Sequence, residues 1–176
     1  MADLSPVDLP ISDLTEAYRL REVSPVAVTQ EVLDRIEQRD PELRAYVFVN
    51  RDEALEQARA AEHAYAVGEP RSSLDGVPIS VKDAFHVRGL PTTLGSRVHR
   101  DVVSRSDSGV VKRLRVAGSV ILGKTNTAEF GQSATCDNML GPDTVNPWGE
   151  GLTPGGSSGG AAVSVAAGMA SVAVGS

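Results

Sequence analysis

Apolar and polar positions recur along this chain with two periods, and these periods predict the order of its helices and strands. In the first 70 residues, apolar side chains return every three or four positions in three segments, the spacing of an amphipathic helix. The predicted helices cover residues 12–20, 25–40 and 51–67. A short β-favouring run at 45–49 separates the second from the third and predicts a buried strand.

Polar residues, prolines and a glycine mark the ends of these helices. Ser12 or Asp13 is the expected N-cap of the first helix. In the second, Ser24 takes the N-cap position and the following proline takes N1, while Pro41 is expected to stop the pattern. Gly68 is placed to cap the third helix at its C-terminus.

The second part of the chain alternates strands, loops and helices. Strands are predicted at 77–81 and 119–122, and a helix capped by Asp107 or Ser108 runs to Ala117 between them. Residues 87–106 show no period and are predicted to be mostly loop, and 161–167 favour a helix. Strand, helix and strand in this order indicate a βαβ unit, hence an α/β fold with a mixed β-sheet flanked by α-helices.

Composition narrows the class of ligand and the compartment. The 176 residues are 41% hydrophobic with a net charge of −6, so we expect a protein that acts on a small molecule, without a nucleic-acid or membrane partner. A single cysteine and the lack of a leader predict a cytoplasmic protein, with a homodimer as one candidate assembly. The Ala/Gly-rich stretch 161–174 is too short to span a bilayer.

Candidate chemistry gathers in two segments. The segment 153–160 sets Ser157 and Ser158 between two pairs of glycines, directly before the predicted helix, so that its hydroxyls lie where the backbone bends sharply and helix N–H groups are free. The second segment runs from Gly76 to Asp83 and contains a short apolar strand that ends on Lys82. A lysine there acts as a general base if burial lowers its pKa from about 10.4 to about 7 or 8.

These segments resemble the amidase signature family, which cleaves or transfers amides with a Ser, cis-Ser, Lys triad. The resemblance covers essentially the whole chain and is densest in five blocks, at 74–78, 81–83, 122–126, 146–148 and 154–160. It implies that Lys82 is the catalytic lysine, that Ser157 is the bridging serine after a cis peptide bond, and that Ser158 and Ser176 support them. It implies a small-molecule amide as substrate, and we expect no cofactor. We also expect no metal, because the three histidines lack metal-ligand spacing and one cysteine gives no thiolate cluster.

The resemblance also implies where the remaining parts lie. In the family the nucleophilic serine follows the bridging serine by roughly two dozen residues, so we expect it just past Ser176 and expect the isolated chain to be inactive. The chain then divides into a helical region with one strand, 1–73, and the N-terminal part of the amidase signature core, 74–176. The amidase signature fold is therefore expected to be incomplete.

Several other motifs give weaker hypotheses. Residues 118–125 match the nucleotide-binding pattern G-x-x-x-x-G-K-[ST], but the strand at 119–122 leaves no loop to hold phosphates. Residues 156–160 match the nucleophile elbow G-x-S-x-G with Ser158 as nucleophile, but no strand precedes them and every histidine lies upstream.

Cys136 has no nearby histidine pattern, so we interpret it as a buried or loop cysteine. We expect Asp83, Thr125 and Asn126 to brace loops, and Trp148 to pack against the serine segment.

Three functions are therefore open. The first is an amidohydrolase, and the second is the glutaminase subunit of a tRNA-dependent amidotransferase, which passes ammonia to a partner. Ala84 and Phe85 after the Lys-Asp pair favour the first, because that subunit usually carries asparagine there. The third is a truncated, inactive scaffold or interaction protein.

Overall fold

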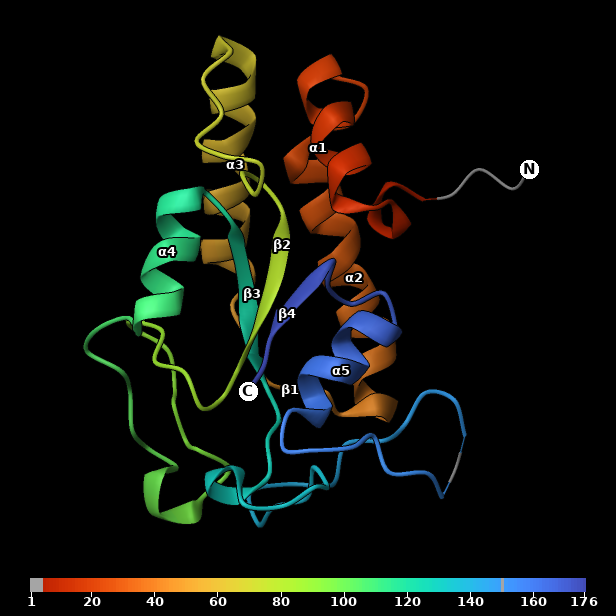
Figure 1. Cartoon of the computed structure of the whole chain (residues 1–176), viewed down its shortest axis with the longest axis vertical. Coiled ribbons are helices and arrows are strands. Elements are labelled where there is room, and N and C mark those ends of the chain that lie inside the picture. The colour runs from red at the N-terminus through yellow and green to blue at the C-terminus, as the bar shows by residue number, and fades with distance from the viewer. Residues whose placement is uncertain (1–4, 150) are drawn as a thin grey trace.

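The structure, a computed structural model, describes residues 5–149 and 151–176 (Figure 1). The helices are α1 (Ile11–Leu20), α2 (Pro25–Leu43), α3 (Arg51–Val67), α4 (Gly109–Ala117) and α5 (Gly159–Ala166). The strands are β1 (Tyr46–Val49), β2 (Pro78–Lys82), β3 (Val120–Thr125) and β4 (Val172–Val174). Short 3₁₀ turns occur at Pro6–Asp8, Arg97–His99 and Glu129–Gly131.

The strands form one mixed sheet in the order β1-β3-β2-β4. β2 is parallel to both β3 and β4, and β1 runs antiparallel to β3. The β2–α4–β3 unit is the βαβ connection that the sequence predicts, and the α/β class is confirmed. β1, from the first of the two predicted regions, thus pairs with a strand of the second.

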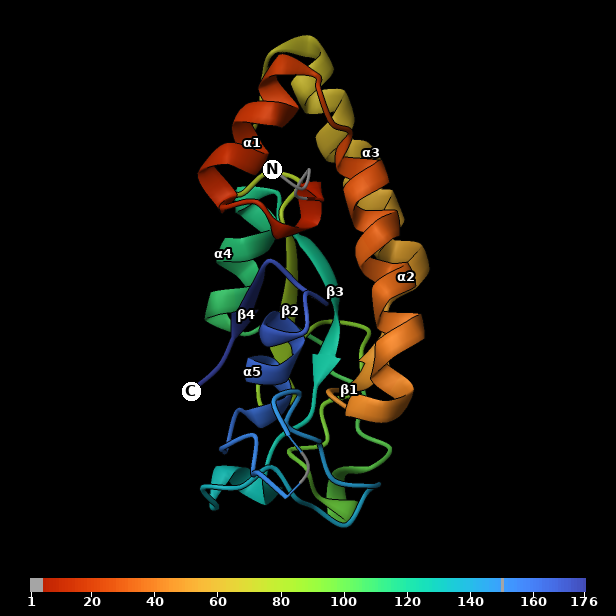
Figure 2. The ribbon, with the colours of Figure 1, turned by 90° about the vertical axis from the view of Figure 1, so that its right-hand side faces the viewer.

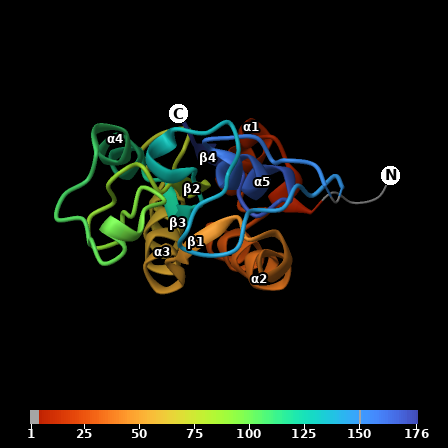
Figure 3. The same ribbon diagram turned by 90° about the horizontal axis from the view of Figure 1, so that it is seen from below.

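The helices cover the sheet on two sides, and Figure 1 shows α4 and α5 on opposite sides of the strands. On β2, Ser80 contacts Ser164 of α5, whereas the neighbouring Val81 packs in a cluster with Val111 of α4. Figures 2 and 3 show α2 and α3 running beside each other. Buried residues of α2, α3, α5 and the sheet form one core, which includes Val32, Leu33, Ile36, Ala54, Ala58, Val120, Leu122, Val163 and Met169.

The second helix continues past the proline that was expected to end it. Pro41 lies inside α2, which ends at Leu43 with Arg44 in the left-handed conformation (φ 54°). A proline so close to the helix end destabilises the helix little. Asp40 holds the last turn, because its carbonyl oxygen accepts the Arg44 N–H at 2.7 Å. The Asp40 carboxylate also accepts the N–H groups of Ala45 and Tyr46, which ties the helix end to β1.

Other boundaries differ by a few residues. α1 begins at Ile11 after Pro10, so neither Ser12 nor Asp13 is its cap, and Leu20 at its end is exposed. β1 was expected to be buried, but it is an edge strand on which Val47 and Val49 are exposed. Gly68 caps α3 as expected, and residues 87–106 are mostly loop.

The parallel strands end on one side, and the long loops after β2 and β3 gather there, in the lower part of Figure 1. In parallel α/β sheets, ligands bind at the carboxyl ends of the strands. None of the described helices has the length and apolar character that crossing a membrane requires.

Gly160 is the contact point between α5 and the end of β3, and its replacement tests this packing. A Cβ there would lie 2.4 Å from the Asn126 backbone nitrogen and 2.5 Å from the Ala45 carbonyl oxygen. We expect Gly160→Ala to lower the free energy of unfolding by about 1–3 kcal/mol, because backbone on two sides resists the added methyl. Urea unfolding, monitored by circular dichroism, measures this change in the free energy of unfolding.

The matched control is Gly109→Ala, at the first position of α4, where a Cβ meets nothing within 4 Å. Alanine there should raise the free energy of unfolding by about 0.5 kcal/mol. Equal effects of the two variants would contradict the packing described for Gly160.

Candidate active site

Lys82 is the last residue of β2, and its amine lies at the centre of the site. The residue is only 1% exposed, although lysine is rarely buried. Its register partner is Thr125, at the end of β3. The Nζ atom donates to the Ser157 hydroxyl oxygen at 2.6 Å and to the Ser176 hydroxyl oxygen at 2.9 Å, with the Ser176 carbonyl oxygen at 3.4 Å. Residues far apart in the sequence therefore meet at one amine.

The loop that carries Ser157 is fixed by close backbone contacts. A Cβ on Gly156 would lie 2.1 Å from the Thr135 carbonyl oxygen, so only glycine fits there. The Gly156–Ser157 peptide bond is cis, as the family resemblance implies. The Ser157 carbonyl oxygen accepts the Ala128 N–H at 3.2 Å, and the loop enters α5 two residues later.

Ser158 holds the segment after β4 beside the lysine. Its hydroxyl donates to the Ser176 carbonyl oxygen at 2.9 Å and accepts the Ser176 N–H at 3.0 Å. This two-way contact places the Ser176 hydroxyl next to Lys82. The structure thus brings Lys82, Ser157, Ser158 and Ser176 together, while their individual roles stay predictions.

The amine opens onto a cavity of about 350 Å³. Its lining is partly apolar and consists of Lys82, Ala84, Leu94, Thr127, Phe130, Gly131, Ser157 and Ser176. A larger cavity, about 470 Å³, lies beside the end of α2 and is lined by residues that include Asp40, Arg44 and Arg100. It shares no lining residue with the first, so the lysine site is identified by its chemistry and not by its size.

Burial shifts the pKa of the Lys82 amine and of the nearby Cys136 thiol toward the neutral form of each group. It lowers the pKa of the Lys82 amine from its ordinary value, and the nearby Cys136 thiol opposes that shift weakly. Cys136 is itself buried, and burial raises the pKa of its thiol, which disfavours the thiolate needed for nucleophilic attack. The environment therefore favours a neutral amine and a protonated thiol.

Part of the site has no clear signal in the sequence. Leu94 and Thr127 line the cavity from loops, and Phe130 and Gly131 line it from the 3₁₀ turn Glu129–Gly131. Leu94 and Phe130 both have left-handed backbone (φ 55° and 50°), which is uncommon for residues other than glycine. Only their nearness to the motif at 122–126 or to Lys82 could have indicated them.

Lys124 and Asp83 form a buried ion pair that the sequence does not predict, with 2.6 Å between Nζ and Oδ1. The strand β3 reaches Thr125 and contains Lys124, so the phosphate-loop interpretation of 118–125 fails as predicted. Asp83 and Asn126 brace loops through Thr93 and Thr144 respectively, as expected, but the Thr125 hydroxyl has no described partner.

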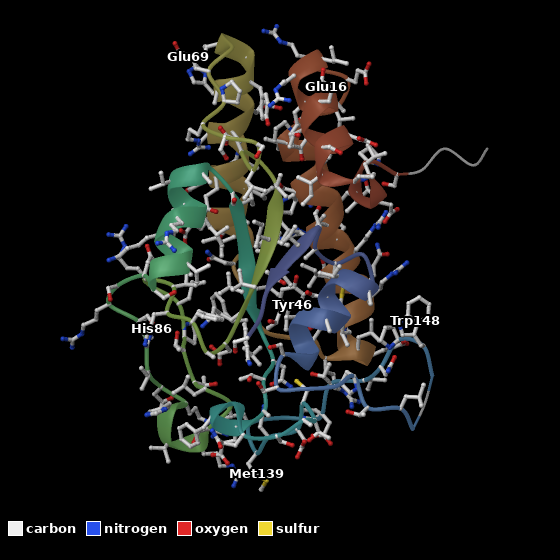
Figure 4. The ribbon with its side chains drawn as sticks, viewed as in Figure 1. Glu16, Tyr46, Glu69, His86, Met139 and Trp148 are labelled. Atoms are coloured by element: carbon white, nitrogen blue, oxygen red, sulfur yellow. The ribbon has the colours of Figure 1, made fainter. Side chains whose placement is uncertain are left out.

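One aromatic residue lies elsewhere than predicted. Asn146 makes the expected turn, in which its side chain accepts the Trp148 N–H and donates to the Thr153 carbonyl oxygen. Trp148, however, is 79% exposed and lies on the outer loop in Figure 4 instead of packing on the serine loop. Within residues 5–149 and 151–176, no group of three His, Cys, Asp or Glu side chains is placed to hold a metal ion.

Comparison with known sequences finds one family. The family model Amidase matches residues 27–176. Among curated relatives, a subunit of the glutamyl-tRNA(Gln) amidotransferase of Trichodesmium erythraeum is 41% identical over 94% of this chain and 34% of that protein. The corresponding protein of Acidothermus cellulolyticus is 44% identical over 93% of this chain and 32% of that protein. The chain spans about a third of the length of these relatives.

Solved structures give the same result. The peptide amidase of Stenotrophomonas maltophilia matches with a TM-score of 0.85 and 34% identity, over 94% of this chain and 35% of that one. A bacterial aryl acylamidase matches with a TM-score of 0.87 and 38% identity over the same shares. A fatty acid amide hydrolase shares the fold, with a TM-score of 0.91 at 24% identity, over 97% of this chain and 30% of that one. With the family model covering most of its length, the chain belongs to the amidase signature family.

Proposed function

We propose that the protein containing this chain cleaves carboxylic amides by acyl transfer, with Lys82 as general base and Ser157 as proton relay. The observation that carries this proposal is the 2.6 Å contact between the Lys82 amine and the Ser157 hydroxyl, at the edge of a cavity. A base must lie within hydrogen-bond reach of the proton it takes, and its pKa must be near the working pH. The burial of Lys82 supports the second condition.

The proton route follows from the contacts. A neutral amine has one lone pair, so the Ser157 hydroxyl donates to Lys82 and can in turn accept a proton from a second hydroxyl. We propose that this hydroxyl belongs to a serine C-terminal to Ser176, whose oxygen attacks the amide carbonyl carbon. The amine then leaves with the proton returned along the same route, and water hydrolyses the resulting ester.

The other residues would position this relay. Ser176 donates or accepts at the Lys82 amine, and Ser158 fixes the Ser176 backbone. Leu94 and Phe130 give the cavity an apolar wall suited to the carbon skeleton of an amide. No step requires a cofactor.

The relay is tested in the chain extended beyond Ser176, by measuring ammonia or amine release from a panel of carboxamides. We expect Lys82→Ala and Ser157→Ala each to lower kcat by about 10³-fold or more, because residues of a relay act as a unit. The matched control Ser133→Ala removes an exposed hydroxyl outside the cavity and should leave kcat unchanged. Hydrolysis by residues 1–176 alone would refute the proposed position of the nucleophile.

A second candidate is the glutaminase subunit of a tRNA-dependent amidotransferase. It is favoured by the relatives at 41% and 44% identity, which are named as subunits of a glutamyl-tRNA(Gln) amidotransferase. Ala84 and Phe85 beside the lysine still favour an amidase that works without a partner. The two differ in how the reaction depends on other proteins.

Ammonia release from glutamine, measured with and without the other components of such an amidotransferase, separates the two candidates. The amidase proposal predicts that simple amides are cleaved at the same rate in both cases. A glutaminase would instead prefer glutamine, and its rate would rise when the partner proteins are added.

The burial of Lys82 also predicts a pH-dependent cost in stability. An amine whose pKa is lower in the folded state destabilises the protein below that pKa, and the cost disappears as the pH rises to the ordinary lysine value. Lys82→Met should therefore raise the free energy of unfolding at pH 7 by about 1 kcal/mol, with a gain that shrinks toward pH 10.

Urea unfolding at several pH values measures this difference, and Lys112→Met, at an exposed position of α4, is the matched control. The control should change stability little at any pH. If Lys82→Met lowered the free energy of unfolding at pH 7, the buried amine would stabilise the fold, and this would contradict the predicted cost of burying it.

A further inference from the structure

A second buried lysine lies behind the first, and it has a carboxylate partner. Lys124 and Asp83 are both fully buried, with 2.6 Å between Nζ and Oδ1. The Lys124 ammonium also donates to the Pro91 carbonyl oxygen at 2.8 Å and to the Thr92 hydroxyl at 3.0 Å. Its three protons therefore each have an acceptor.

The strands place this ion pair on the opposite face of the sheet from the site. Side chains alternate between faces along a strand, and Lys124 is paired in register with Val81, one residue before Lys82. Asp83 is one residue after Lys82, and its N–H donates to the Thr125 carbonyl oxygen at 2.9 Å. The ion pair thus connects β3 to the residue directly after Lys82.

The same aspartate anchors the wall of the cavity. Its Oδ2 accepts the Thr93 N–H at 3.0 Å, and its carbonyl oxygen accepts the Leu94 N–H at 3.1 Å. The Leu94 carbonyl oxygen then accepts the Phe130 N–H at 2.8 Å. A continuous set of hydrogen bonds connects the buried ion pair to two residues that line the lysine cavity.

We propose that the Lys124–Asp83 ion pair is a positioning unit, which fixes the end of β2 and the 91–94 loop so that the Lys82 amine stays within reach of Ser157 and shielded from water. This inference deepens the proposed function and rests on it for the chemistry assigned to Lys82. Neither Lys124 nor Asp83 lines the cavity, so the unit acts through Lys82.

A role in stability alone would not require charges. Apolar residues of similar volume often replace a buried ion pair at no cost in stability. They cannot bond to a loop carbonyl, a threonine hydroxyl and a backbone N–H at once, as Lys124 and Asp83 do. The polar contacts fix a geometry, and the experiment must therefore report on that geometry.

The proposal is tested in the chain extended beyond Ser176, in which residues 1–176 contribute three lysines, Lys82, Lys112 and Lys124. With ¹³Cε-labelled lysine, an NMR titration follows the Lys82 amine, whose signal is identified by its loss in the Lys82→Ala variant. The test variant is Asp83→Asn with Lys124→Met, which removes one charge of each sign and keeps an amide oxygen to accept the Thr93 N–H. The nearby titratable Cys136 is unchanged.

The matched control is Asp75→Asn with Arg71→Met. It removes an ion pair of the same length, 2.6 Å, in which Asp75 is fully buried just before the other end of β2. We expect the titration midpoint of Lys82 to rise by about one pH unit toward the ordinary lysine value in the test variant, because water reaches a loosened amine. In the control it should not move.

The outcomes separate the two proposals. A folded test variant in which Lys82 titrates as before overturns the positioning role and leaves the base role intact. If Lys82 titrates at the ordinary lysine value already in the unsubstituted protein, the base role fails, and with it the positioning role. If the test variant does not fold, Thr92→Val removes one acceptor of Lys124 and keeps both charges. It should then shift Lys82 in the same direction by less, and an unmoved Lys82 in that folded variant overturns the proposal.

Discussion

The site depends on a buried amine that is held by hydroxyl groups. Two lysines lie on the neighbouring strands β2 and β3, one register position apart, and both are buried. Lys124 meets a carboxylate, whose charge opposes the effect of burial on its pKa. Lys82 meets the oxygen atoms of Ser157 and Ser176 instead. Hydroxyls stabilise an ammonium less than a carboxylate does, so the second arrangement favours a neutral amine that can take a proton.

The fold makes this arrangement by bringing three segments to the carboxyl ends of parallel strands. β2 ends on Lys82, β4 leads into Ser176, and the serine loop enters α5 between them in the sequence. Glycines at 156 and 160 let this loop approach the backbone of Thr135, Ala45 and Asn126 more closely than any side chain permits. The loop therefore has little freedom, and the Ser157 hydroxyl is fixed beside the amine before any substrate binds.

The sequence predicted the parts of this protein that depend on local chemistry. The proline after Ser24, the glycine after α3 and the block around Ser157 each act through neighbouring residues, and the structure places each in its expected element. The features that the sequence did not predict correctly depend on tertiary contacts. Pro41 stays helical because Asp40 holds the last turn against β1, and Trp148 is exposed because the turn at Asn146 directs it outward. The Lys124–Asp83 ion pair needed the strand register, which no local pattern gives.

The most direct test of the central claim is to identify which serine reacts. A fluorophosphonate probe forms a covalent adduct with an activated serine, and peptide mass spectrometry locates that adduct in the chain extended beyond Ser176. The account predicts a single adduct on a serine C-terminal to Ser176, which disappears in the Lys82→Ala variant. An adduct on Ser157 or Ser158, or labelling that persists without Lys82, would contradict the assignment of Lys82 and Ser157 as base and relay.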